Sequence, residues 1–182
     1  MISDFIKGKK KFEFPPVIQQ GIMLHRSIDI FTDVHPATKR AREVFRPQYR
    51  LYSGAFVDVV YDHFLATDPQ EFPGDTLAGF SRATYATLDQ FESWLPPGFA
   101  RMFPYMKSQD WLYHYHTREG TAKSFAGLVR RSAYLTDAQP AFAAFEQHYQ
   151  LLGDCYRQFW PELLQFARSE YKILTGIEPE FG

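Results

Sequence analysis

Residues 15–33 read PPVIQQGIMLHRSIDIFTD. The two prolines suit the first turn of a helix, where the missing backbone N–H would have no partner anyway. After them, apolar residues recur at the spacing of one helix face up to about Asp33. Positions four apart lie on the same face of a helix, so His25, Asp29 and roughly Asp33 form one column of metal-capable side chains.

A second predicted helix repeats this spacing. Residues 53–65 read SGAFVDVVYDHFL, in which Ser53 fits the N-cap and the apolar residues form the buried side. Asp58 and Asp62 lie four residues apart and form a second column, with His63 directly after it. Two such columns facing each other would form a cage for a metal ion.

The rest of the chain also shows helical patterns, and we find no run of alternating β-branched residues and no internal repeat. The further segments expected to be helical or short and aromatic-rich are 36–45, 75–94 (closed by Pro96-Pro97-Gly98), 102–107, 111–115, 121–134 and 139–174. Pro161 should kink or split the last of these. The sequence therefore predicts an all-α fold, a helical bundle in one domain over residues 1–182.

Composition is that of an ordinary globular protein with many aromatic rings. Of 182 residues, 45% are hydrophobic and 23% charged, and the 18% aromatic share is best explained by packing between helices. The single cysteine, Cys155, cannot form an internal disulfide, which favours a reducing compartment and a core position for its side chain. No apolar run approaches the roughly 20 residues of a membrane span, and no signal peptide is evident, so we expect a cytoplasmic protein.

Charge is divided unevenly along the chain. Residues 1–50 hold ten Lys and Arg against five Asp and Glu, and residues 51–182 hold ten against sixteen, which gives net charges of +5 and −6. Besides Arg26, the basic residues of the first part are Lys7, Lys9, Lys10, Lys11, Lys39, Arg40, Arg42, Arg46 and Arg50. Any one of them is most simply a solvated surface charge. Together, beside the acidic columns, they predict a surface that attracts an acidic partner or a phosphate.

The two columns point to a particular chemistry. Mixed His and Asp ligands suit Mn²⁺, Fe²⁺, Zn²⁺ or Mg²⁺, and the oxygen-rich set favours Mn²⁺ or Mg²⁺. Such an ion lowers the pKa of bound water and offsets charge on a phosphoryl oxygen, so hydrolysis of a phosphoester is the reaction we favour. A surface ion pair of His25 with Asp29 is the simpler alternative for that column.

Several blocks of the chain resemble the acyl carrier protein phosphodiesterase family. They are ISDFIKG at 2–8, Gly21-Ile22, LHRSIDIFTD at 24–33, DVVYDHFL at 58–65, and Trp111-Leu112 with Tyr115. The resemblance implies a helical fold distantly similar to HD-type metal-dependent phosphohydrolases. It also implies removal of the 4′-phosphopantetheine arm from the serine of holo acyl carrier protein, with Mn²⁺ or another divalent cation, Mg²⁺ or Fe²⁺ among them.

The resemblance also implies roles for individual residues. Asp4 falls at a position implicated in metal binding, and Asp62 with His63 match positions that bind metal or handle protons. Arg26 could hold a phosphate or pair with a neighbouring Asp. The predicted site residues are thus Asp4, His25, Asp29, Asp33, Asp58 and Asp62 for the metal, and Asp62, His63 and Arg26 for catalysis.

The same resemblance sets expectations about partners and about the start of the chain. The acidic acyl carrier protein should dock on the basic N-terminal surface, and we expect neither nucleic acid nor a membrane as a partner. Relatives begin further upstream with a segment that carries a histidine, so we expect a family N-terminal segment to be missing here.

Two other functions remain open from the sequence. One is a metal-dependent phosphohydrolase of a nucleotide or another small phosphodiester, and the other is an inactive helical binding module. The remaining histidines, His35, His114, His116 and His148, are expected in surface or packing roles.

Overall fold

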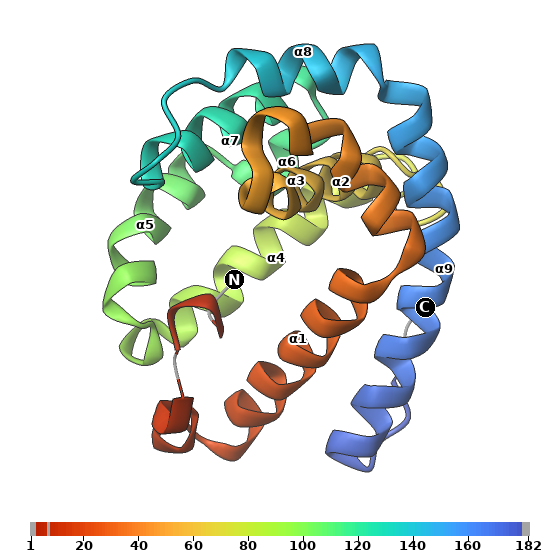
Figure 1. The fold of residues 1–182 in the computed structure, drawn as a ribbon. Coiled ribbons are helices and arrows are strands. Elements are labelled where there is room, and N and C mark those ends of the chain that lie inside the picture. Colours follow the sequence, from red (N-terminus) through yellow and green to blue (C-terminus); the bar gives the residue numbers. More distant parts are fainter. Residues whose placement is uncertain (1–2, 7, 180–182) are drawn as a thin grey trace.

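The computed structural model describes residues 3–6 and 8–179, and within these ranges the chain is helical and has no β-strand. The all-α prediction is confirmed (Figure 1). The α-helices are α1 (Pro16–Val34), α2 (Pro36–Tyr49), α3 (Ser53–Ala66), α4 (Thr76–Gln90), α5 (Pro97–Ser108), α6 (Trp111–His114), α7 (Arg118–Arg131), α8 (Gln139–Gln147) and α9 (Tyr149–Thr175). Short 3₁₀ helices are η1 (Ser3–Phe5), η2 (Gly8–Glu13), η3 (Arg50–Tyr52) and η4 (Glu92–Trp94).

The main core lies where α2 and α3 meet α7, α8 and α9, and it is largely aromatic. Phe45 stacks on Phe56 with ring centroids 5.6 Å apart, and Phe125 meets Phe56 edge-on at 5.2 Å. Phe145 packs against Phe125 in the same manner at 6.1 Å. Rings of this size contribute about 2–3 kcal/mol each when fully buried, so they account for the high aromatic content. Cys155 is fully buried in this core, as expected.

Helix α1 lies alongside α9 and also contacts α2 (Figure 1). Phe31 stacks on Phe166 of α9 at 4.6 Å, and the side-chain amide of Gln20 donates to the carbonyl of Leu174. These contacts hold one side of α1 against the bundle. His25 and Asp29, on another side of the helix, remain accessible to solvent.

A second, smaller core joins α4, α5 and α6. It contains Tyr85, Leu95, Phe99, Phe103 and Met106. The N-terminal segment docks on it, because the ring of Phe5 meets Phe99 edge-on at 5.9 Å. This small core therefore sets where η1 lies relative to α1.

The structure differs from the sequence-based expectation at several helix boundaries. The segment 139–174 is divided at His148, not at Pro161, which lies inside the continuous helix α9. Helix α8 packs against α2 and α7, whereas α9 packs against α1, α2 and α3, so the division falls where the chain leaves α7 and reaches α1. Ser53 is the first residue of α3 and not its cap, since Tyr52 occupies that position.

Two more boundaries near the small core also differ. Pro97 opens α5, which absorbs the short segment expected at 102–107. Helix α4 ends at Gln90, and the end of the longer expected helix is the separate η4. No helix in the described part of the chain is both long enough and apolar enough to cross a membrane.

Candidate metal centre

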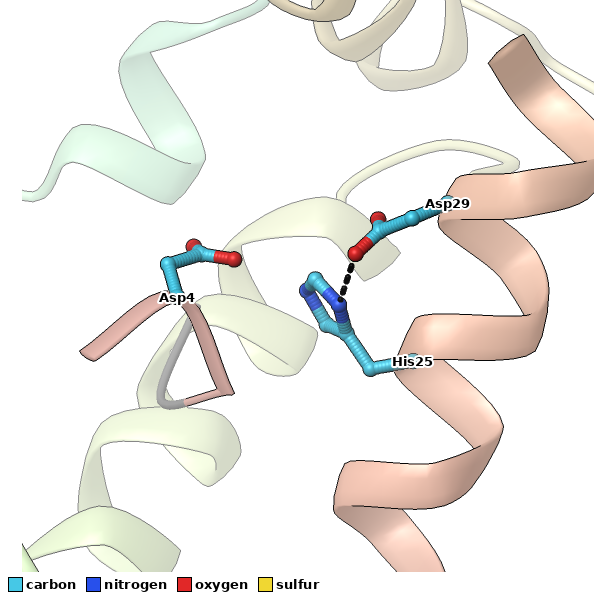
Figure 2. A group of neighbouring side chains, drawn as sticks. All are labelled: Asp4, His25 and Asp29. Atoms are coloured by element: carbon cyan, nitrogen blue, oxygen red, sulfur yellow. Dashed lines mark hydrogen bonds and ion pairs between the residues drawn. The ribbon is translucent and has the colours of Figure 1, made fainter. Parts of the chain in front are cut away.

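Three of the predicted ligands converge from two separate segments. Asp4 comes from η1, and His25 and Asp29 come from successive turns of α1. One potential ligand atom from each of the three lies within 4.8 Å of the others, and His25 Nδ1 is 3.0 Å from Asp29 Oδ2. Figure 2 shows the three side chains pointing toward one another. The structure therefore brings together a two-carboxylate, one-imidazole group.

The position of Asp4 is set by its neighbours in the chain. Ile6 is buried, and its carbonyl accepts a hydrogen bond of 2.7 Å from Arg26 Nη2. Phe5 covers Gly98 so closely that a Cβ at Gly98 would lie 2.6 Å from its ring. The segment is thus clamped between α1 and α5, and this clamp directs Asp4 toward His25.

The donor set fits a divalent cation. Carboxylate and imidazole ligands together suit Mn²⁺, Fe²⁺ and Zn²⁺, and an oxygen majority also admits Mg²⁺. Two carboxylates held this close repel each other, and a bound cation would offset that repulsion. On the chemistry of its side chains, the group of Asp4, His25 and Asp29 can hold the predicted ion.

The second column, on α3, has a different electrostatic character. Solvent reaches Asp58 and Asp62, yet the surrounding protein removes enough hydration to raise their pKa values to about 6 and about 7. Burial is the largest cause in both. For Asp58 the negative charges of Asp29, Asp33 and Asp4 add to it, while Arg42 opposes it.

Asp62 is linked to the rest of the site through two neighbours. The charge of Asp58 helps to raise the pKa of Asp62, and a hydrogen bond from the side chain of Tyr115 acts in the opposite direction. Tyr115 is also hydrogen-bonded to Ser124 of α7. The α3 carboxylates therefore share the electrostatic surroundings of the metal group, and Asp62 connects them to α6 and α7.

Asp33 does not join the three-residue group. Its carboxylate is paired with Arg42 of α2, on the wall of a pocket of about 640 Å³ that Asp58 also lines. The column predicted from the four-residue spacing thus ends at Asp29. Asp33 turns to α2 because Arg42 offers a charge-assisted hydrogen bond there.

The structure gives Arg26 a contact that the sequence did not predict. Its Nη2 atom donates a hydrogen bond to the Ile6 carbonyl, and its role toward a phosphate stays a prediction. In this position Arg26 holds the segment that carries Asp4.

His63 is also placed away from the metal group. It is 2% exposed, and its two ring nitrogens contact the Tyr115 carbonyl at 2.8 Å and the Tyr149 hydroxyl at 3.0 Å. Burial is the main cause of its lowered pKa. Adjacent helix residues point in different directions, so Asp62 faces the site while His63 enters the core, and we leave His63 out of the proposed catalytic group.

Sequence reasoning left the role of Tyr115 open and did not single out Ser124 or Arg131. All three line a second pocket, of about 740 Å³, between α3, α6 and α7. Only the tertiary arrangement joins these residues to Asp62, because nothing in their spacing relates them to α3. Of the remaining histidines, His35 has the expected structural role, since its ring accepts a hydrogen bond from the Ala37 N–H at the start of α2.

Comparisons with known proteins agree with the family resemblance seen in the sequence. The family model described as acyl carrier protein phosphodiesterase matches residues 1–163. The acyl carrier protein phosphodiesterase of Yersinia pestis is 34% identical over 171 residues, which cover 93% of this chain and 89% of the relative. That of Serratia proteamaculans (strain 568) is 30% identical with the same coverage. No solved structure matches the chain, so the similarity to HD-type phosphohydrolases stays a prediction. The family match and these relatives show that the chain belongs to the acyl carrier protein phosphodiesterase family.

Proposed function

We propose that this protein hydrolyses the phosphodiester between 4′-phosphopantetheine and serine in holo acyl carrier protein, with a divalent cation held by Asp4, His25 and Asp29. The products are the apo protein and 4′-phosphopantetheine. The observation that carries the proposal is the convergence of these three side chains in a member of this family. Mn²⁺ is the cation we favour, with Mg²⁺ and Fe²⁺ as alternatives.

The residues of the site have distinct parts in the proposed reaction. A bound cation would lower the pKa of water and offset charge on the phosphoryl oxygens. Asp62 has a pKa of about 7, within the range in which a carboxyl group can exchange protons at neutral pH. We therefore assign the transfer of a proton to Asp62. The role of Asp58 is to help keep the pKa of Asp62 raised through its negative charge.

We assign the docking surface for the acidic partner to the pocket between α2 and α3. Lys39, Arg46 and Arg50 line it together with Asp58, so positive side chains border the acidic site. Leu51, beside Arg50, is 98% exposed, which adds an apolar contact point to the charged rim. An acidic protein docked here would bring its modified serine near the α3 carboxylates.

The direct test is a gel-shift assay for conversion of holo to apo acyl carrier protein by the purified chain, with added Mn²⁺ or with chelator. Conversion that requires the cation and is lost in Asp29→Ala supports the proposal. A folded chain that binds Mn²⁺ and hydrolyses bis(4-nitrophenyl) phosphate but leaves holo acyl carrier protein intact would move the function to another phosphodiester.

The docking surface has a separate test with a matched control. Arg46→Glu combined with Arg50→Glu should raise the KM for holo acyl carrier protein by about tenfold or more at low salt, while bis(4-nitrophenyl) phosphate is hydrolysed as before. Arg82→Glu combined with Arg101→Glu changes the net charge equally on exposed parts of α4 and α5. An equal rise in KM for both pairs would show a general charge effect and no docking surface.

We also propose a cytoplasmic location. The single buried thiol of Cys155 suits a reducing compartment, in which free cysteines persist.

A further inference from the structure

The pocket between α3, α6 and α7 is the larger of the two described above, at about 740 Å³. A cavity of this size can enclose most of a small organic ligand. Its lining combines aromatic and small side chains, among them Val59, Trp111, Tyr115 and Gly127, with polar groups such as Gln109 and Arg130.

This pocket begins beside the carboxylate to which we assign proton transfer. Tyr115 lines the pocket, and its side chain is hydrogen-bonded to Asp62. Val59, also in the lining, lies on α3 between Asp58 and Asp62. A molecule whose phosphoryl end lies at Asp62 would therefore have its next atoms at Tyr115 and the rest along α7.

The face that α7 turns to the pocket carries small residues, and it is packed against the His114 backbone at Gly120 but has room at Gly127. Gly120, Ser124 and Gly127 are four and three residues apart, so they share one side of the helix, and all three line the cavity. At Gly127, an added Cβ would meet only the flexible end of Arg131, at 3.3 Å. A larger side chain at Gly127 would thus occupy space that the pocket now leaves to a ligand.

We propose that this pocket holds the pantetheine arm of the substrate, with the phosphodiester end at Tyr115 and Asp62. The arm is a slender, uncharged chain of apolar segments and two amides, which needs apolar walls with a few hydrogen-bond donors. Trp111 and Val59 supply such walls, and Gln109 and Arg130 supply donors. This inference rests on the proposed function. It adds to that function a binding site for the pantetheine arm, which the enzyme would recognise separately from the protein carrier.

The test compares two glycine substitutions in helices. Gly127→Leu fills the pocket, and Gly79→Leu is the matched control, because Gly79 lies exposed in α4 with nothing near its Cβ position. Binding of free 4′-phosphopantetheine and of AMP is measured by calorimetry with Mn²⁺ present. The kcat/KM for holo acyl carrier protein and the rate with bis(4-nitrophenyl) phosphate are measured on the same samples.

Gly127→Leu should weaken 4′-phosphopantetheine binding and lower kcat/KM for holo acyl carrier protein by about tenfold or more, because a misplaced substrate reacts slowly. Hydrolysis of bis(4-nitrophenyl) phosphate, which has no pantetheine arm, should stay within about twofold, since the cation site is intact. Gly79→Leu should change none of these. Ala126→Phe, at an exposed position of the lining, repeats the test if Gly127→Leu does not fold.

Two results would overturn the proposal: undiminished 4′-phosphopantetheine binding in the folded pocket variants, or tighter binding of AMP than of 4′-phosphopantetheine by the unaltered chain. The calorimetry does not depend on turnover. If the unaltered chain fails to convert holo acyl carrier protein, the proposed function fails, and the binding data still decide whether this pocket takes the arm.

Discussion

The two acidic columns share a spacing but differ in their surroundings. On α1, His25 and Asp29 are joined by a contact of 3.0 Å and meet Asp4 from another segment. On α3, Asp58 and Asp62 also reach solvent, yet neighbouring protein raises their pKa values to about 6 and about 7. The same four-residue spacing therefore produces a ligand group on one helix and proton-holding carboxyls on the other.

The cause of this difference lies in what each helix packs against. Helix α1 turns its column toward the short N-terminal segment, which supplies one more ligand and leaves the group accessible. Helix α3 lies between α2 and α7, and this nearby protein removes part of the hydration of its column. Sequence spacing indicates which side chains share a face, and the neighbours of that face decide what those side chains do.

The largest expected effect comes from breaking the α1 group. Asp29→Ala removes one of three ligands and the partner of His25, so cation binding should be lost. A bound cation supplies several kcal/mol to the transition state, and about 4 kcal/mol corresponds to a rate loss of about 1000-fold. Calorimetry with Mn²⁺ and the holo-to-apo assay measure both losses.

Asp33→Ala is the control for that variant, because Asp33 is paired with Arg42 outside the group. It should retain Mn²⁺ affinity within about threefold, the scale of a change in a distant surface charge. Loss of Mn²⁺ binding in Asp33→Ala would return Asp33 to the ligand set and extend the α1 column as the spacing first suggested.

The second effect concerns the inner side of α3. His63→Ala leaves the Tyr115 carbonyl and the Tyr149 hydroxyl without their partner and opens a cavity, so the free energy of unfolding should fall by about 3 kcal/mol. Urea denaturation measures this loss. At a temperature where the variant is folded, its kcat should stay close to that of the unaltered chain, and a kcat loss of about 100-fold without a loss of stability would restore His63 to the catalytic group.

Part of the candidate site could be predicted from the sequence, and the reason is local. His25 and Asp29 are related by helix geometry alone, so their contact follows once α1 is recognised. The approach of Asp4 depends on Phe5 packing against Phe99, which is far along the chain and has no signal in the spacing. The resemblance to a family pointed to Asp4 where geometry could not.

Prediction of the fold from the sequence also fails where contacts between distant segments decide the structure. The all-α class follows from the periodicity of apolar residues, and the bounds of α1 and α3 lie close to the expected ones. The division at His148 could not be predicted, because the apolar pattern continues on both sides and only the change of packing partner sets it. Pro161, the expected breaking point, lies within α9.

The third effect tests the clamp that joins Asp4 to the α1 group. Arg26→Ala removes the bond to the Ile6 carbonyl and loosens the segment that carries Asp4, so the Mn²⁺ concentration for half-maximal activity should rise by about tenfold. At saturating Mn²⁺, kcat should recover to within about threefold, since no group at the phosphorus is lost. A fall in kcat that saturating Mn²⁺ does not restore would show that Arg26 contacts the phosphate instead.

The smallest effect isolates the α3 column through its dependence on pH. The folded-state pKa of Asp62 is about 7, above the ordinary value of about 4 expected in the unfolded chain. A carboxyl group with a raised folded pKa contributes its full stability below pH 4 and loses it as pH rises through 7. Asp62→Asn has no ionisable group at this position. With chelator present, the free energy of unfolding of this variant should therefore increase between pH 4 and pH 8 relative to that of the unaltered chain.

Solvent reaches Asp62, so screening reduces the expected gain in unfolding free energy to about 1 kcal/mol, a factor of about five in the folding equilibrium. Urea denaturation across this pH range measures it. Asp75→Asn, at an exposed position before α4 where the side chain makes no cap bond, controls for the substitution itself. An equal pH trend in both variants would mean that the pKa of Asp62 is not raised in the folded chain. The two helices would then differ only in that α1 carries the metal ligands.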